Sequence, residues 1–250
     1  MKRKLFVLVF VGIIGCAEPT PTPQEVVDQA IAFSGTEKLR NGSATFDFRN
    51  ISYEYWREKW AYKYVRIQTD TAANEIKDVL SNDGLVRFIN GEQTLITEER
   101  RAAYTSSVNS VMYFAFLPLW LNDPAVNKSY GGITEIEGKK YHKIKITFAE
   151  EGGGEDFEDV FYYWFDIEDY SMDYLAYSYV EKEGTGVRFR KAYNARRVNG
   201  VMIQDYVNMK PKSKELKLEE IDEAFINGDL EQLSLIELKD VDININNKEK

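Results

Sequence analysis

Residues 160–167 read Val-Phe-Tyr-Tyr-Trp-Phe-Asp-Ile, and this stretch decides the fold class. Its aromatic run favours a β-strand. A strand with one solvent-exposed face alternates apolar and polar residues, whereas in this stretch both alternating sets of residues are apolar or aromatic. We therefore predict a strand whose two faces are both covered. One face meets helices, and the other needs a loop, a partner or a ligand.

Patterns of period two extend from this strand in both directions along the chain. The residues after it favour strands at 174–181, 187–198, 201–209 and 233–241. The residues before it favour strands at 43–55, 60–68, 76–80, 85–89, 134–137 and 141–148, with a bulge or bend at Arg49-Asn50. Turn signals such as Asn82-Asp83-Gly84 and Asn199-Gly200 separate them. Short turns between successive strands predict an antiparallel meander, so the predicted fold class is mainly β with a minor helical part (α+β).

Three segments follow a helical pattern instead. Thr22, Pro23 and Glu25 form a capped helix start and Gly35 suits a left-handed stop, which predicts a helix over residues 23–34. A second helix is predicted over 105–115, before Pro118, and a short third one over 216–225. The apolar residues from 108 to 121 form either a core plug or a lid over a cavity.

The composition of this 250-residue chain excludes several classes of function. The formal net charge is −9 and no basic block occurs, so nucleic acid is not a predicted partner. A single Cys excludes an intrachain disulfide, and a single His, His142, excludes a multi-histidine zinc site. Because no nucleophile, phosphate-loop or zinc signature occurs, we assign no catalytic residue, no metal site and no cofactor.

The loop at residues 150–159 contains six carboxylates and three glycines. Calcium prefers oxygen ligands, and glycines would let a loop wrap around an ion. The spacing is not that of the twelve-residue calcium loop, so a solvated acidic loop is the prediction.

The N-terminus carries an export signal. Lys2, Arg3 and Lys4 precede an apolar run over residues 5–14, which is too short to span a bilayer as a helix. The sequence Ile13-Ile14-Gly15-Cys16 resembles the bacterial lipobox. That resemblance implies cleavage before Cys16, which would then carry a diacylglycerol thioether and an N-linked acyl chain such as palmitate. Two or more acyl chains hold a protein stably, so we expect firm membrane attachment.

The order of these segments resembles a group of bacterial proteins. Two stretches contribute to the resemblance: Phe33-Ser34-Gly35 and Leu117-Pro118-Leu119-Trp120-Leu121-Asn122-Asp123-Pro124. Together they look like an uncharacterised family of Gram-negative lipoproteins, similar in architecture to the carrier and receptor proteins of outer-membrane lipoprotein sorting. The resemblance implies a strongly curved antiparallel sheet, an unclosed half-barrel, whose concave face is covered by helices above an apolar cavity. It does not carry over transport activity, because one fold can serve several functions.

These signals divide the chain into four parts. Residues 1–15 are the expected lipoprotein signal peptide, 16–22 the lipidated Cys and Pro-rich tether, 23–243 a single curved-sheet domain and 244–250 a polar tail. In lipoproteins of the Gram-negative type, Asp after the lipidated Cys marks inner-membrane retention. Ala17 stands there instead, so we expect a lipid-anchored protein of the cell envelope, in the outer rather than the inner membrane.

The leading hypothesis is a non-enzymatic lipoprotein that binds an apolar or amphipathic, lipid-like ligand. A curved sheet with an aromatic concave face can hold an acyl chain. The residues expected to line the cavity are Phe46, Phe48, Tyr62, Tyr64, Phe116, Trp120, His142, Ile144, Ile146, Phe148, Tyr162 and Trp164. The alternative for all of them is that they only fill the core.

Two other functions stay open. An envelope interaction module would dock a protein partner through an exposed apolar patch at residues 117–121. A hydrolase would need two carboxylates that face each other in a cleft, such as the pair Asp166 and Asp169. A cavity behind Tyr162 and Trp164 would favour ligand binding instead.

Overall fold

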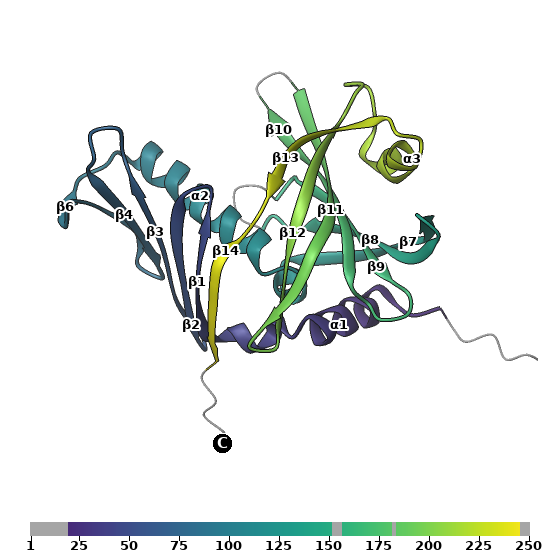
Figure 1. The fold of residues 1–250 in the computed structure, drawn as a ribbon, viewed down its shortest axis with the longest axis horizontal. Coiled ribbons are helices and arrows are strands. Elements are labelled where there is room, and N and C mark those ends of the chain that lie inside the picture. Colours follow the sequence, from purple (N-terminus) through teal and green to yellow (C-terminus); the bar gives the residue numbers. More distant parts are fainter. Residues whose placement is uncertain (1–19, 152–156, 182–183, 246–250) are drawn as a thin grey trace, which may run out of the picture.

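The structure is a computed structural model, and it describes residues 20–151, 157–181 and 184–245. Two antiparallel sheets of seven strands each form the body of the protein, and neither sheet closes on itself (Figure 1). The predicted fold class, a mainly β and unclosed antiparallel architecture with few helices, is confirmed. The predicted signal peptide, Cys16 and the central part of the acidic loop lie outside the described residues.

The first sheet has the strand order β14-β1-β2-β3-β4-β5-β6. Its strands are β1 (Asn41–Phe48), β2 (Ile51–Glu58), β3 (Ala61–Thr69), β4 (Glu75–Ser81), β5 (Gly84–Ile89), β6 (Glu92–Thr94) and β14 (Lys239–Ile245). The bulge or bend expected at Arg49-Asn50 is instead a two-residue hairpin turn, because both residues have positive φ and Phe48 pairs with Ile51 across them.

The second sheet has the order β13-β12-β11-β10-β9-β8-β7. Its strands are β7 (Val126–Ile136), β8 (Lys139–Phe148), β9 (Val160–Asp166), β10 (Met172–Glu181), β11 (Gly184–Val198), β12 (Val201–Pro211) and β13 (Leu230–Ile236). The strand predicted at 134–137 is the end of the longer β7. The strand predicted at 233–241 is wrong as a single element, because β13 and β14 belong to different sheets.

The two sheets meet where the chain crosses from β13 to β14. Figure 1 shows β14 between β1 and β12 in the middle of the view. The backbone N–H of Leu238, in the crossing segment, donates to Asp205 Oδ1 of β12 at 3.0 Å. Arg196 of β11 pairs with the same carboxylate at 3.2 Å, and Asn199 Nδ2 donates to the carbonyl of Ile243. These side chains join the sheets where backbone pairing stops.

The first helix, α1 (Pro23–Ser34), lies over the second sheet. The predicted capping box at Thr22 and Glu25 is present, and Gly35 ends the helix at φ 69°. A Cβ at Gly35 would lie 2.3 Å from the Gly200 carbonyl oxygen, so both the turn and the close approach require glycine. A 3₁₀ turn, η1 (Thr36–Arg40), connects α1 to β1.

The second helix, α2 (Glu98–Ala115), is longer than the predicted 105–115 because Thr97 caps it seven residues earlier. Val108 and Met112 are buried against the first sheet. Residues 116–121, which include most of η2 (Leu119–Asn122), are buried as well, so this part of the apolar segment is a core plug, whereas Val111, Phe114 and Ala115 of α2 are only half-buried. Among the residues that the structure describes, no helix combines the length and apolar character needed to cross a membrane.

Strand β9 is covered on both faces, as its sequence predicted. Phe161, Tyr163 and Phe165 pack in the cluster that contains α1. Tyr162 and Trp164 pack on the opposite face against η3 (Leu218–Glu220) and α3 (Ile221–Ile226), which correspond to the predicted helix at 216–225. The buried ion pair between Lys143 Nζ and Asp222, at 2.9 Å, fixes α3 there. The second cover is therefore a segment of the chain itself.

Candidate functional site

A groove of about 320 Å³ opens between α2 and the second sheet. Val111, Phe114 and Ala115 form its helical wall. Phe48 and Arg49 line it at the end of β1, and Ser110 of α2 lines it as well. The remaining residues come from β10 to β13 and the crossing segment, and they are Tyr177, Arg188, Arg190, Gln204, Tyr206, Asn208, Leu233, Ile236 and Leu238. Because both sheets and α2 contribute, the groove lies where the two sheets diverge.

Most of the groove wall is apolar or aromatic. The rings of Phe114 and Tyr177 lie 5.2 Å apart between centroids, and Tyr177 stacks on Phe161 at 5.3 Å. Tyr206 contributes its ring, and burial raises the pKa of its hydroxyl to about 12, so this group stays neutral. A wall of this kind receives an apolar chain without desolvating a charged surface.

Three arginines line the groove, namely Arg49, Arg188 and Arg190, and of these only Arg190 is buried. The Arg190 side chain is 7% exposed, and its guanidinium carbon lies 3.9 Å from the centroid of the Phe114 ring. Its Nη2 donates to the Tyr177 hydroxyl at 2.9 Å, whereas its Nε is buried without a hydrogen-bond partner. Within the described residues, no carboxylate forms an ion pair with Arg190. A buried guanidinium without a counter-ion lowers the stability of the folded protein, so its presence in the groove requires an explanation.

Asn208 lies directly beside Arg190, because the two residues pair across β11 and β12. Asn208 is also 7% exposed. Its Nδ2 donates to Ser234 Oγ at 3.1 Å, while its Oδ1 is buried without a partner. With the amide turned the other way, the nitrogen instead of the oxygen would be left unpaired. The groove wall therefore carries two adjacent polar side chains that each have one buried atom without a hydrogen-bond partner, Arg190 Nε and Asn208 Oδ1.

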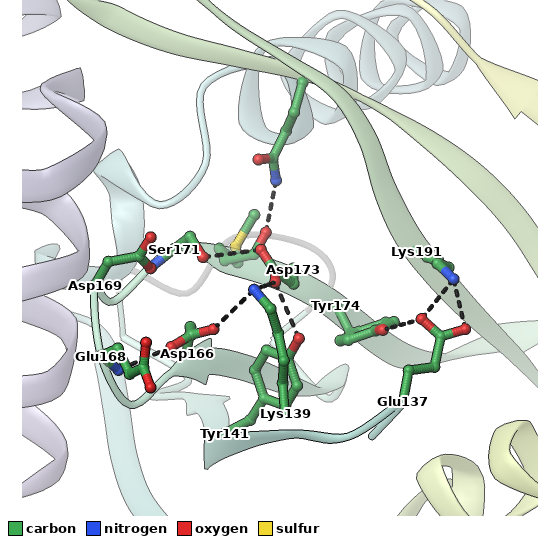
Figure 2. Close-up of polar contacts among 12 residues, drawn as sticks. Glu137, Lys139, Tyr141, Asp166, Glu168, Asp169, Ser171, Asp173, Tyr174 and Lys191 are labelled. Atoms are coloured by element: carbon green, nitrogen blue, oxygen red, sulfur yellow. Dashed lines mark hydrogen bonds and ion pairs between the residues drawn. The ribbon is translucent and has the colours of Figure 1, made fainter. Parts of the chain in front are cut away.

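A second and more polar cavity, of about 510 Å³, lies at the end of the second sheet beside the C-terminal part of α1. Figure 2 shows that Lys139 points between two carboxylates there, with its Nζ 3.2 Å from Asp166 Oδ2 and 3.9 Å from Asp173 Oδ2. Ser171 Oγ and the Tyr141 hydroxyl both donate to Asp173. Burial raises the pKa of the Asp173 carboxyl.

A further ion pair lies at the other side of this cavity. Lys191 Nζ is 2.6 Å from Glu137 Oε1, and the Tyr174 hydroxyl donates to the same carboxylate at 3.0 Å (Figure 2). The hydrogen bond from Lys191 lowers the pKa of Glu137. Since each of these carboxylates already has donors from the chain, the network holds the ends of the strands in place. In the described part of the chain, no three His, Cys, Asp or Glu side chains are grouped to hold a metal ion.

The predicted cavity residues of the first half of the chain lie in the core between α2 and the first sheet. Phe46, Tyr64, Phe116 and Trp120 are all buried there, and burial raises the pKa of Tyr64 to about 12. Tyr62 is half-buried at the edge of this cluster. Phe48 is half-buried and is the one member of the predicted set that lines the groove.

The predicted residues of the second half lie on two opposite faces. Ile144 and Ile146 are fully buried in the cluster beneath α1, and the half-buried Phe148 packs against it. His142 is buried, with its Nδ1 2.9 Å from the Tyr130 hydroxyl. Tyr162 and Trp164 lie on the far face, beneath α3. The structure thus does not gather the predicted set into one site.

The groove residues that the sequence did not indicate are chiefly Arg190, Phe114 and Asn208. In the stretch Val187-Arg188-Phe189-Arg190, alternation predicts an inward Phe189 and solvated arginines. The structure buries both residues, because Phe189 packs with α3 on one face of the sheet and Arg190 lines the groove on the other. The available signal was that both faces of β9 are apolar, which implies that both faces of the neighbouring strands are covered.

The structure is thus that of a mainly β protein with a largely apolar groove between α2 and the second of two open sheets. The sequence profile described as "Family of unknown function (DUF6503)" matches residues 22–240, so the chain belongs to this family. No curated protein matches the sequence.

Several solved structures are similar to this chain at low sequence identity. A LolA superfamily protein from Nitrosomonas europaea is 8% identical with a TM-score of 0.48, over 89% of this chain and 94% of that one. A putative outer membrane lipoprotein-sorting protein domain from Vibrio parahaemolyticus is 6% identical with a TM-score of 0.43, over 91% and 95%. The Mycobacterium tuberculosis lipoprotein LppX is 13% identical with a TM-score of 0.28, over 65% and 91%. The profile match confirms the expectation from the sequence that the chain belongs to an uncharacterised family.

Proposed function

We propose that this protein is an envelope lipoprotein that binds an apolar or amphipathic, lipid-like ligand in the groove between α2 and the second sheet. The observation that carries the proposal is the groove itself, about 320 Å³ of space walled by Phe48, Val111, Phe114 and Tyr177. Space of this size among apolar side chains is typical of a site for a small ligand, since a filled core leaves few voids larger than a water molecule.

The alternative of a protein-docking module requires an exposed apolar patch at residues 117–121, and the structure has no such exposure there. Leu117, Leu119, Trp120 and Leu121 are buried, so the middle apolar segment presents no patch to a partner. This segment instead connects the core beneath α2 with the core beneath α1. We propose no partner protein on its account.

The hydrolase alternative has a stronger candidate in the polar cavity, but its carboxylates are occupied. Asp166 accepts from Lys139 and from the backbone N–H of Glu168, while Asp173 accepts from Ser171 and Tyr141. Asp169, the other member of the pair considered from the sequence, accepts from the backbone N–H of Ser171. We propose a binding protein rather than an enzyme.

Attachment to the membrane belongs to the same proposal. The lipobox-like sequence ending at Cys16 supports an N-terminal lipid anchor, and Ala17 supports an outer-membrane rather than an inner-membrane location. The first described element, α1, begins only seven residues after Cys16. The domain would therefore lie close to the bilayer, from which a lipid-like ligand can be taken.

Photolabelling tests the binding site directly. The full chain is held in lipid nanodiscs and labelled with dodecanol that carries a diazirine group, and labelled peptides are identified by mass spectrometry. We expect label in the C-terminal half of α2 and in β10 to β12, suppressed by excess unlabelled dodecanol. Val111→Trp fills the groove and should lower the apparent affinity by about ten-fold.

A matched control uses the same helix. Ala103 is exposed on α2 and lies outside the groove, so Ala103→Trp should leave the labelling unchanged. Label spread evenly over the surface, or equal labelling of both Trp variants, would contradict the proposed site.

A further inference from the structure

The position of Arg190 specifies the chemistry of the ligand further. We infer that the groove selects an amphipathic molecule with an oxyanion head, a carboxylate or a phosphate on a single apolar chain, and that Arg190 is the group that recognises this head. This inference rests on the proposed function, because it assigns the polar end of a ligand whose apolar end occupies the groove.

The guanidinium of Arg190 contacts aromatic rings through its faces, whereas Nε at its edge has no hydrogen-bond partner. Phe114 covers one face at 3.9 Å, and Tyr177 lies 5.2 Å from the guanidinium carbon. Such cation–π contacts involve the face of the group and do not satisfy its N–H donors, which lie in its plane. Of these donors, one on Nη2 has a partner in Tyr177, whereas Nε has none. The in-plane edge is where a carboxylate or phosphate binds a guanidinium.

The surroundings of Arg190 indicate that its anionic partner belongs to a bound ligand and not to a side chain of the protein. In the part of the chain that the structure describes, Arg190 has no carboxylate partner, although Asp and Glu together number 41 in the sequence. The other two buried arginines, Arg66 and Arg87, both pair with Asp78. Arg190 therefore differs from Arg66 and Arg87 in having no carboxylate beside it, and it lines the groove.

A second polar group would help to fix the head. Asn208 pairs with Arg190 in register, lines the same groove and has a buried amide oxygen without a partner. A head with an oxyanion and an adjacent hydroxyl or N–H would satisfy both residues at once. The chain of the ligand would then extend along Phe114, Val111 and Ile236.

Competition against the neutral diazirine probe tests this assignment in the full chain held in nanodiscs. The competitors are dodecanoate, dodecyl phosphate and dodecanol, which share one chain and differ in the head, together with acetate and inorganic phosphate, which lack the chain. For the unmodified protein we expect one of the two anionic amphiphiles to displace the probe at about ten-fold lower concentration than dodecanol. The stronger of the two identifies the head as carboxylate or phosphate.

The variant Arg190→Met keeps the length of the side chain and removes the charge. It should abolish the preference for the anionic amphiphiles while dodecanol competes as before. Arg190→Gln, which keeps a polar end, repeats the test if the Met variant does not fold. The control Arg100→Met removes the same charge from an exposed position of α2 outside the groove and should preserve the preference.

The outcomes separate this inference from the proposed function. Equal competition by dodecanoate, dodecyl phosphate and dodecanol in the unmodified protein, or an unchanged preference in Arg190→Met, overturns the assignment of Arg190 but leaves the groove as a binding site. Loss of the preference in Arg100→Met overturns it too, because the preference would then follow the net charge of the protein and not a group in the groove. Displacement by acetate or inorganic phosphate alone overturns the amphipathic ligand. Absence of label from the groove overturns the proposed function together with the inference.

Discussion

Arg190 on β11 and Phe114 on α2 are stacked across the groove, with 3.9 Å between the guanidinium carbon and the ring centroid. This contact joins the helix to the second sheet at the point where the two sheets diverge. It is also the point at which the core contains a charge without a counter-ion, so the same residue pair links stability to binding.

The first prediction concerns the stability cost of that charge. Replacing a buried charged group by an apolar side chain of similar size is often neutral or stabilising. For Arg190→Met we expect the free energy of unfolding to stay unchanged or to rise by up to about 2 kcal/mol, as measured by denaturant unfolding. The matched variant is Arg87→Met, also buried but paired with Asp78, which should lose about 3 kcal/mol. Equal losses in both variants would show that Arg190 has a structural role like that of Arg87.

The second prediction concerns the buried ionic group beneath α2. Asp78 is fully buried and accepts from Arg66 Nη2 and Arg87 Nε, each at 2.7 Å. Although burial opposes ionisation, the hydrogen bonds from Arg87 and Arg66 hold the pKa of Asp78 below its usual value. Asp78→Asn removes the negative charge and leaves two buried cations, so we expect a loss of about 3–5 kcal/mol in the free energy of unfolding. Asp83→Asn, at an exposed turn position, is the control and should change it by less than about 0.5 kcal/mol.

The third prediction concerns the pH dependence of the free energy of unfolding, to which His142 contributes. Burial lowers the pKa of His142 below its ordinary 6.5. The unfolded chain therefore takes up this proton at a higher pH than the folded chain, and stability should fall as the pH decreases from 6.5 toward the folded pKa. Because His142 is the only His, the variant His142→Phe should lose this component of the fall between pH 7 and pH 5. A pKa above 6.5 for His142 in a proton NMR titration would contradict the prediction.

The fourth prediction tests the anchor. Cys16→Ser removes the thiol to which the diacylglycerol would be attached, so the protein should no longer incorporate a fatty-acid analogue and should leave the membrane fraction. Ala17→Ser, one residue further on, keeps the thiol and serves as the control. Continued labelling of the Cys16→Ser variant would show that the anchor is elsewhere.

The parts of the fold that could be predicted depend on local signals. The capping box at Thr22 and the glycine at position 35 define α1 because a helix end is determined by a few neighbouring residues. The apolar character of both faces of β9 likewise follows from its own residues. In contrast, α2 begins seven residues before the predicted start, since its first two turns pack through Tyr104 against Arg87 and contain few apolar residues.

The groove could not be predicted from alternation, because alternation does not tell which face of a strand is more deeply covered. Phe189 and Arg190 are adjacent and both buried, one beneath α3 and the other in the groove. Local patterns in a sequence also contain no information on where two sheets separate. That position depends on Glu237 and Leu238, where the chain leaves one sheet for the other.

The pairing of β14 with β1 has a consequence for how the chain is assembled. Ile243 lies opposite Ala44, so almost the whole length of the polypeptide separates two residues that are neighbours in the sheet. Contacts between such distant residues form late and slow the folding reaction. Until the last segment arrives, β1 is an edge with unpaired backbone groups, which can pair with another chain. A chain cut short before Leu238 would keep that edge permanently, and we expect it to self-associate, whereas a chain that contains β14 covers the edge.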